Sequence, residues 1–238
     1  KFIEHEKIRK SNLIEIHNRP NYIDFLYEYN KNLILYFHND PLKMKSSSTL
    51  KDRKRILQKT LKIIFNSKWS LKQFTKGLKK NEYKNKLKVI HQSTNKKKIN
   101  FRKKKNIIIF VGRLNRSKGY DIFGNAVINI LNKYSNWQSI IIGDEPREKI
   151  IFNHKRFNVL GFQNNTTVTK WFKKAQISVT CSRIDEPFGR TALEASSTGC
   201  AVIITNRGGL PEASPNAIKL NNLSIKNLQN KIEKLIKN

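Results

Sequence analysis

The chain has 238 residues, of which 48 are Lys or Arg and 17 are Asp or Glu, so its formal net charge at pH 7 is 48 − 17 = +31. That length is enough for one large domain or two small ones, and no apolar run reaches the ~18 residues of a membrane-spanning helix. Three explanations of the charge stay open: a nucleic-acid partner, an anionic membrane surface, and a compositional bias. We attribute most of the charge to the bias, because the Lys residues are scattered among many Asn and Ile residues.

The first part of the chain alternates between short apolar strands and helices. Strands are predicted at residues 12–16, 32–37, 62–65 and 87–90. Helices are predicted at residues 1–11, 20–29, 50–60 and 67–78, with Ser67 as the N-cap of the last one. Polar residues follow the strand ends, and this rhythm is typical of a Rossmann-like unit. We therefore predict a first domain at residues 1–98.

A charged, turn-rich run without hydrophobic periodicity follows at residues 93–105 (STNKKKINFRKKK). We interpret it as a solvated basic loop between two domains rather than as a nucleic-acid-binding tract. Residues 99–105 are taken as the linker, and the second domain is predicted at residues 106–238.

The second domain begins with NIIIFV at residues 106–111, a composition typical of a strand buried on both faces. Further strands are predicted at 138–142, 157–160, 177–181 and 201–205, which gives strand–helix–strand units and hence a parallel sheet. Cys181 and Cys200 adjoin two of these strands and are expected to be buried free thiols. The helices are predicted at 120–134, at 166–175, from Pro187 as the first helical residue to the stop at Gly199, and at 223–236.

Two acids, Glu186 and Glu194, lie at the start of the helix predicted after Pro187, with seven residues between them. In parallel α/β sheets, ligands bind beyond the carboxyl ends of the strands, where helix N-termini attract anions. The amides of Phe188, Gly189 and Arg190 are therefore candidates to meet a phosphate, and the two carboxylates to accept hydrogen bonds from hydroxyls. The alternative is that both acids are solvated and favoured there by the helix dipole alone.

The stretch EPFGRTALEASSTGCAVIITNRGGLPE around these acids closely resembles the signature of retaining glycosyltransferases of the GT-B fold, specifically family 4. The run GRLNRSKG at residues 112–119 is similar to the donor-phosphate motif of that family, G-R-L-x4-G after a buried strand. The resemblance implies an α/β GT-B fold with two Rossmann-like domains whose parallel sheets face a cleft. The opening strand, the glycine-rich loop and the first crossovers of the family are not in this sequence. We therefore expect an incomplete N-terminal domain and a fragment of a longer protein.

The resemblance also implies roles for individual residues. Arg113 and Lys118, beside Gly112, would neutralise the charge that develops on the leaving diphosphate. Glu186 would hold hydroxyls of the donor sugar, and Glu194 those of the ribose. Asp144 and Gly161 would line the nucleotide pocket.

The first domain supplies a candidate acid/base group. His38, in ILYFHNDP, ends a buried strand where the family has a His near the reacting sugar; a His that only satisfies a loop is the alternative. His17, in IEIHNRP, has a similar place one strand earlier. His91 stands where the family often has an Asn-Gly pair, and this departure puts its hinge role in doubt.

The expected activity is transfer of a sugar, with retention, from a UDP- or GDP-linked donor to a saccharide or lipid-linked acceptor in envelope polysaccharide or lipopolysaccharide synthesis. We expect a cytoplasmic enzyme, with an anionic membrane surface as a candidate partner and no specific nucleic acid. No metal or cofactor is expected, because no DxD-like motif stands at a strand end. The alternatives are a basic nucleic-acid-binding protein, motivated by the charge, and an inactive partial glycosyltransferase.

Overall fold

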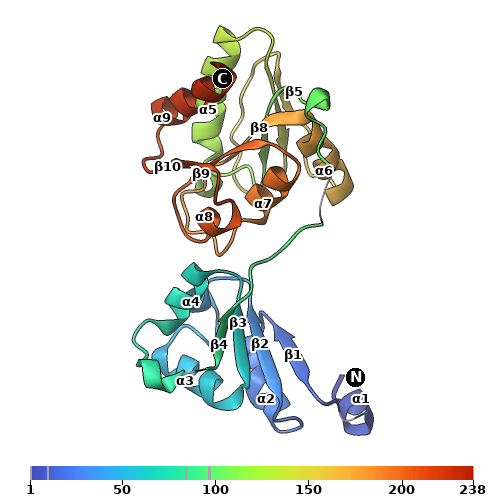
Figure 1. The fold of residues 1–238 in the computed structure, drawn as a ribbon, viewed down its shortest axis with the longest axis vertical. Helices are drawn as coiled ribbons and strands as arrows, with labels where there is room; N and C mark the ends of the chain where they lie inside the picture. The colour runs from blue at the N-terminus through green and yellow to red at the C-terminus, as the bar shows by residue number, and fades with distance from the viewer. Residues whose placement is uncertain (1, 10, 84, 96–97, 238) are drawn as a thin grey trace. The chain divides into compact units, whose positions relative to one another are not determined.

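The chain forms two compact units, Lys1–Gln92 and Ser93–Asn238 (Figure 1). The computed structural model describes residues 2–9, 11–83, 85–95 and 98–237. Lys1 and Lys10 of the first predicted helix, and Lys96 and Lys97 of the charged run, lie outside these residues. No helix within the described ranges is both long enough and apolar enough to span a bilayer.

The first unit contains a four-stranded parallel sheet in the order β1-β2-β3-β4. Its strands, which agree with the predicted ones to within two residues, are β1 (Ile14–His17), β2 (Leu33–Phe37), β3 (Lys62–Phe65) and β4 (Leu87–Val89). Its α-helices are α1 (Phe2–Arg9), α2 (Ile23–Tyr27), α3 (Leu50–Lys59) and α4 (Lys68–Thr75). Short 3-10 turns lie at η1 (Pro20–Tyr22), η2 (Pro41–Lys43) and η3 (Lys80–Glu82).

The core of the first unit follows from alternation along the strands. Every second residue of β2 is buried, and Phe37 packs with Phe65 and Phe74 at ring-centroid distances of 5.3–5.6 Å. The predicted cap of α4 is confirmed: the Ser67 hydroxyl accepts a hydrogen bond from the Ser70 amide at 2.9 Å.

The second unit contains a six-stranded parallel sheet in the order β10-β9-β8-β5-β6-β7. Its strands are β5 (Lys105–Val111), β6 (Gln138–Ile142), β7 (Phe157–Val159), β8 (Ala175–Thr180), β9 (Ala201–Thr205) and β10 (Ile218–Leu220). Its helices are α5 (Tyr120–Lys133), α6 (Asn165–Lys174), α7 (Arg190–Ser197), α8 (Leu210–Ala213) and α9 (Ile225–Lys237), with 3-10 turns η4 (Phe101–Lys103) and η5 (Arg116–Lys118). Residues of the predicted linker thus include η4 and the first residue of β5.

Helices cover both faces of this sheet (Figure 1). Ile108 and Phe110 of β5 pack with α5 and α9, whereas Ile107 and Ile109 pack on the other face with α6, α7 and α8. The uninterrupted apolar run in β5 is explained by this double coverage, as predicted. Cys181 and Cys200 are buried free thiols, also as predicted.

The predicted start of the central helix is wrong. The α-helix begins at Arg190 rather than at Pro187, and Gly189 before it has a φ of 112°. The backbone from Glu186 to Phe188 is held in an irregular loop, because a Cβ on Gly209 would lie 2.3 Å from the Pro187 carbonyl oxygen. Of the three amides proposed for a phosphate, only that of Arg190 therefore belongs to the helix.

Candidate active site

The carboxyl ends of β5, β6 and β7 meet through backbone contacts between their loops. The Gly112 amide donates to the Ile142 carbonyl at 3.0 Å, and the Gly143 amide donates to the Gly161 carbonyl at 2.9 Å. A Cβ on Gly143 would lie 1.9 Å from the Gly112 carbonyl oxygen, so only glycine permits this approach. The predicted pocket residues Gly112 and Gly161 therefore lie along one edge of the sheet, and Asp144 beside them is exposed.

Asn115 organises the turn that carries Lys118. Its buried side chain accepts hydrogen bonds from the Ser117 hydroxyl at 2.8 Å and from the Lys118 amide at 3.0 Å. Its amide nitrogen donates to Glu145 at 3.0 Å, and Arg147 beside that carboxylate lowers the pKa of Glu145 to about 2. Sequence reasoning missed Asn115, although an Asn that opens a turn is a recognisable signal.

An ion pair fastens this turn to the loop after β8. The Arg183 guanidinium donates to both carboxylate oxygens of Asp121, at 2.6 and 2.7 Å. The Arg183 amide also donates to the Ser117 carbonyl at 2.9 Å. Hydrogen bonding from Arg183 lowers the pKa of Asp121, so the carboxylate is charged at neutral pH. Sequence reasoning also missed this pair, because its members are 62 residues apart in the chain.

Lys118 and Glu186, both predicted from the sequence, are in contact. The ammonium of Lys118 donates to Oε1 of Glu186, and the side chains are 23% and 15% exposed. The backbone of Glu186 is held as well, because its carbonyl accepts from the Gly209 amide at 2.7 Å. A Cβ on Gly208 would lie 2.3 Å from that carbonyl oxygen. The pair is therefore fixed by two loops that follow β5 and β9 and by the loop after β8.

The first turn of α7 carries the other predicted acid. Arg190 contacts Glu194 one turn later at 3.2 Å, and no side chain among the described residues caps the helix N-terminus. Phe188, before the helix, is buried and fills space rather than lining a site. Within the described residues, no hydrogen bond or ion pair joins Arg190 or Glu194 to Lys118 or Glu186.

A polar cavity of about 210 Å³ opens beside Glu194 within the second unit. Its hydroxyl and amide groups come from three separate segments, and sequence reasoning did not find them. The lining residues are Ser93, Thr94, Asn95, Asn165, Thr169, Arg190, Glu194, Ser197 and Thr198. Such a lining suits a small ligand that carries several hydroxyl groups.

Arg113 lies between the glycine contacts and the Lys118 turn. Its side chain is exposed, and it has no ion pair among the residues that the structure describes. Its guanidinium is therefore available to an anion in solution, in contrast to the ammonium of Lys118.

In the first unit, His38 directly follows the carboxyl end of β2. Its amide donates to the Asn18 side chain at 3.2 Å, and its carbonyl accepts from the buried Asn66 amide at 2.9 Å. Both asparagines also follow strands, so His38 is held at the edge where parallel sheets bind ligands. No three His, Cys, Asp or Glu side chains gather into a metal site within the described ranges; that no metal is essential stays a prediction.

Comparisons with known proteins identify the region that carries most of these residues. The family model described as "Glycosyl transferases group 1" matches residues 91–238. An uncharacterized glycosyltransferase of Methanocaldococcus jannaschii is 34% identical over 135 residues, which cover 48% of this chain and 32% of that protein. The catalogued human phosphatidylinositol N-acetylglucosaminyltransferase chain is 32% identical over 137 residues, covering 54% of this chain and 28% of that protein. The matched segment thus spans about a third of the length of these relatives.

The fold has a solved counterpart. The crystal structure of Anabaena Alr3699/HepE in complex with UDP and glucose matches with a TM-score of 0.75 at 18% identity, over 98% of this chain and 70% of that chain. The predicted α/β fold with two parallel-sheet domains of GT-B type is thereby confirmed.

Proposed function

The chain belongs to the glycosyl transferases group 1 family, and on that premise we propose that it is a retaining, family-4 enzyme that binds a nucleotide sugar at the carboxyl edge of the second sheet. The contact between Lys118 and Glu186 carries this proposal. A cation and an acid 68 residues apart in sequence meet at the ends of two neighbouring strands, beside glycines that expose the backbone. This is where an α/β sheet binds a phosphorylated ligand.

In the proposed mechanism, the donor diphosphate lies against Lys118 and Arg113, and the free N-terminus of α7 adds a partial positive charge. Negative charge grows on the diphosphate as the glycosidic bond breaks, so these groups stabilise the transition state more than the bound donor. Glu186 holds hydroxyls of the sugar, and Glu194 accepts hydrogen bonds from the ribose inside the polar cavity.

Retention is proposed to follow a same-face displacement. Glu186 is engaged by Lys118 and Glu194 by Arg190, so neither carboxylate is offered as a nucleophile. The leaving phosphate then helps to remove the proton of the acceptor hydroxyl as the new bond forms on the same face, and His38 is the proposed acid/base group.

The proposed donor is UDP- or GDP-linked. The Anabaena structure was solved with UDP and glucose, which supports a UDP-linked donor. The human relative is named for a transfer to phosphatidylinositol, which supports a lipid-linked acceptor over a free saccharide. Envelope polysaccharide or lipopolysaccharide synthesis is the proposed pathway, and no metal or cofactor is required because the fixed cations carry the phosphate charge.

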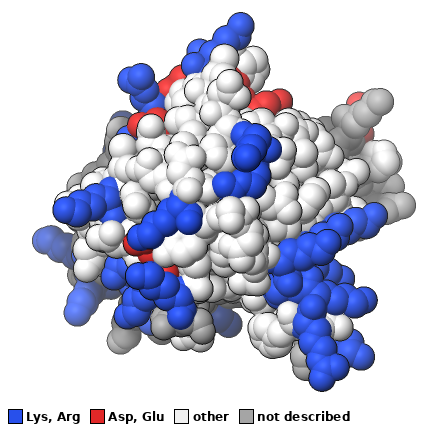
Figure 2. All heavy atoms as spheres, turned by 90° about the horizontal axis from the view of Figure 1, so that it is seen from above, with Lys and Arg blue, Asp and Glu red and all other residues white. Residues whose placement is uncertain are grey.

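Attachment to an anionic membrane surface is a further part of the proposal, with the cytoplasm as the compartment. On the face drawn in Figure 2, Lys and Arg side chains lie in several groups toward the outline and predominate over acidic ones. Each well-placed Lys or Arg contributes about 1 kcal/mol to such attachment. We expect binding to vesicles that contain anionic lipid, weakening with salt; equal binding to neutral vesicles would contradict it.

Thermal unfolding of the full chain at physiological salt tests the nucleotide site. A ligand at 100 times its Kd stabilises the folded state by about 2.7 kcal/mol, so UDP, GDP and UDP-glucose should raise the Tm, and UMP should raise it less. Lys118→Met should abolish the shift. Lys133→Met, which removes another ion-paired lysine of the same unit, is the matched control and should leave it intact. Protection by a polynucleotide but by no nucleotide sugar would favour the nucleic-acid-binding alternative.

A further inference from the structure

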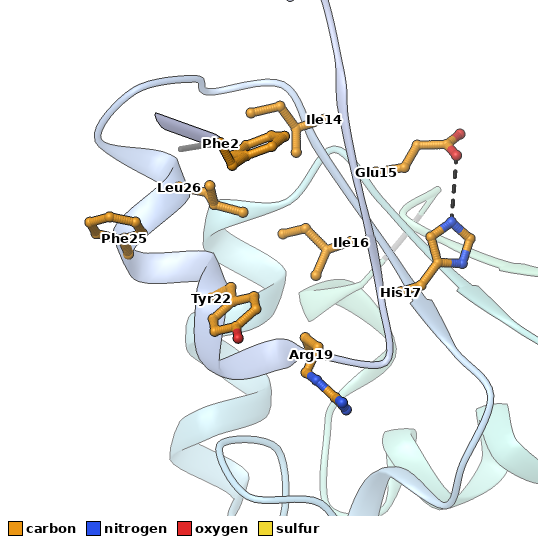
Figure 3. Close-up of a pocket in the computed structure, with 9 residues that line it drawn as sticks. All are labelled: Phe2, Ile14, Glu15, Ile16, His17, Arg19, Tyr22, Phe25 and Leu26. Atoms are coloured by element: carbon orange, nitrogen blue, oxygen red, sulfur yellow. Dashed lines mark ion pairs between the residues drawn. The ribbon is translucent and has the colours of Figure 1, made fainter. Parts of the chain in front are cut away.

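Strand β1 presents two different faces. Ile14 and Ile16 point toward Phe2 and Leu26 in an apolar groove, whereas Glu15 and His17 lie on the opposite side of the strand (Figure 3). The carboxylate of Glu15 is 3.6 Å from Nε2 of His17. This spacing is longer than a hydrogen bond but short enough for a strong electrostatic contact when the imidazole is protonated.

His17 also contacts His38, the proposed acid/base group. Nδ1 of His17 is 3.0 Å from Nε2 of His38, a normal hydrogen-bond distance. The two rings are nearly coplanar, at 7°, and their centroids are 5.3 Å apart. Since the nitrogens are much closer than the centroids, the rings meet by their edges, with one proton between the two nitrogens.

The neighbours of the pair decide where that proton is. The amide nitrogen of Gln92 is 3.3 Å from Nδ1 of His38, and an amide NH₂ group can only donate. Nδ1 of His38 is therefore the acceptor, and the ring proton is on Nε2, directed at His17. His17 accepts it at Nδ1 and carries its own proton on Nε2, facing Glu15. One tautomer for each ring satisfies every contact.

Other groups around the pair support this arrangement. The Tyr36 hydroxyl donates to the second oxygen of Glu15 at 3.3 Å, and the Tyr36 ring stacks on His17 with centroids 4.5 Å apart. Burial, followed by the charge of Glu15, raises the pKa of Tyr36, so the hydroxyl remains a donor. The Arg19 guanidinium is engaged with the Asn18 carbonyl at 3.2 Å.

We propose that His17, together with Glu15, is a positioning residue that fixes the tautomer of His38 and raises its affinity for a proton. The catalytic meaning rests on the proposed function: a substrate hydroxyl takes the place of the Gln92 amide and donates to Nδ1 of His38. When its O–H bond breaks, the proton forms a new N–H bond at Nδ1. The positive charge is shared with His17 through the proton between the rings, and the Glu15 carboxylate balances it.

Long-range ¹H–¹⁵N spectra of the full chain, with labelled His, report tautomer and protonation midpoint for each of its five His residues. We expect Nε2-protonated rings at both positions and a coupled, two-step titration. Glu15→Gln should lower the protonation midpoint of the pair by about 0.5–1 pH unit, because a charge near 4 Å is lost. Glu28→Gln, an exposed acid of the same unit, is the matched control and should cause no change.

Two substitutions separate positioning from packing. His17→Phe keeps the ring on Tyr36 but removes both nitrogens, so His38 should lose its single tautomer and titrate in one step. His17→Asn restores an acceptor near the position of Nδ1 and should restore the tautomer without the second step. If His38 titrates alone in the native chain, or if Glu15→Gln behaves like Glu28→Gln, the proposal is overturned. UDP binding, measured on the same samples, tests the nucleotide site independently and fails or succeeds without affecting the His result.

Discussion

Gly208 is the position at which a single methyl group should displace the site. Its φ is 57°, and an added Cβ would lie 2.3 Å from the carbonyl oxygen and 2.6 Å from the nitrogen of Glu186. Gly161 has a similar φ of 67°, but nothing lies within 4 Å of its added Cβ. The pair Gly208→Ala and Gly161→Ala therefore separates the cost of left-handed backbone, common to both, from the cost of the clash.

The left-handed conformation should cost each variant about 1–2 kcal/mol of unfolding free energy. Gly208→Ala must in addition push the Glu186 backbone out of the way, at a further cost of about 1–3 kcal/mol typical of overpacking. Because Glu186 then moves relative to Lys118, affinity for UDP-glucose should also fall. Gly77→Ala in the first unit, with a φ of 78° and only the tip of Leu50 at 3.6 Å, is the control for ligand binding.

Urea unfolding should be followed in a Trp69→Phe background, which leaves Trp137 and Trp171 as probes, both in the second unit. This choice matters because the two units need not unfold together. Calorimetric titration with UDP-glucose gives the binding arm. Equal unfolding free energies for Gly208→Ala and Gly161→Ala, within the usual 0.3–0.5 kcal/mol, would refute the claim that this backbone contact holds Glu186 in place.

Three further predictions concern the charged groups. Lys118→Met and Glu186→Gln should each destabilise the second unit by about 1–2 kcal/mol, and the double variant by about 1 kcal/mol less than the sum; strict additivity in urea unfolding would show that the pair contributes nothing. Glu194→Gln should weaken UDP and UDP-glucose alike, by about tenfold, whereas Glu186→Gln should weaken only UDP-glucose; equal losses of UDP affinity in titrations of both variants would contradict the division of roles. Because Arg183 lowers the pKa of Asp121, the pair should contribute about 1 kcal/mol above the unfolded pKa of ~3.9 and lose it as pH falls through the lower folded value, so Arg183→Gln should flatten that part of the stability–pH curve, and an unchanged acid limb would count against it.

The sequence by itself determined the secondary structure and the family. The strands at β3, β6 and β9 have the predicted bounds, because apolar runs flanked by glycine and polar residues are local signals. The motif at residues 112–119 and the two glutamates lie inside the region that matches the family. The roles given to these residues, and to His38, stay predictions.

Local signals failed where a distant segment decides the local conformation. A Pro followed by a helical pattern predicted a helix from Pro187, but the chain at Gly208 and Gly209 packs against that loop and delays the helix to Arg190. The short α8 and β10 were missed for a related reason: each is too brief to have a period of its own and forms only against its neighbours.

Only the tertiary structure decided which residues meet. The sheet order places β8 next to β5, and this adjacency brings Glu186 to Lys118 and Arg183 to Asp121 across more than sixty residues of chain. The parallel register of β1 and β2 similarly brings His17 to His38. Strand order and register depend on how buried faces pack rather than on any one segment, and so the pairs that make up the site could not be read from the residues that compose them.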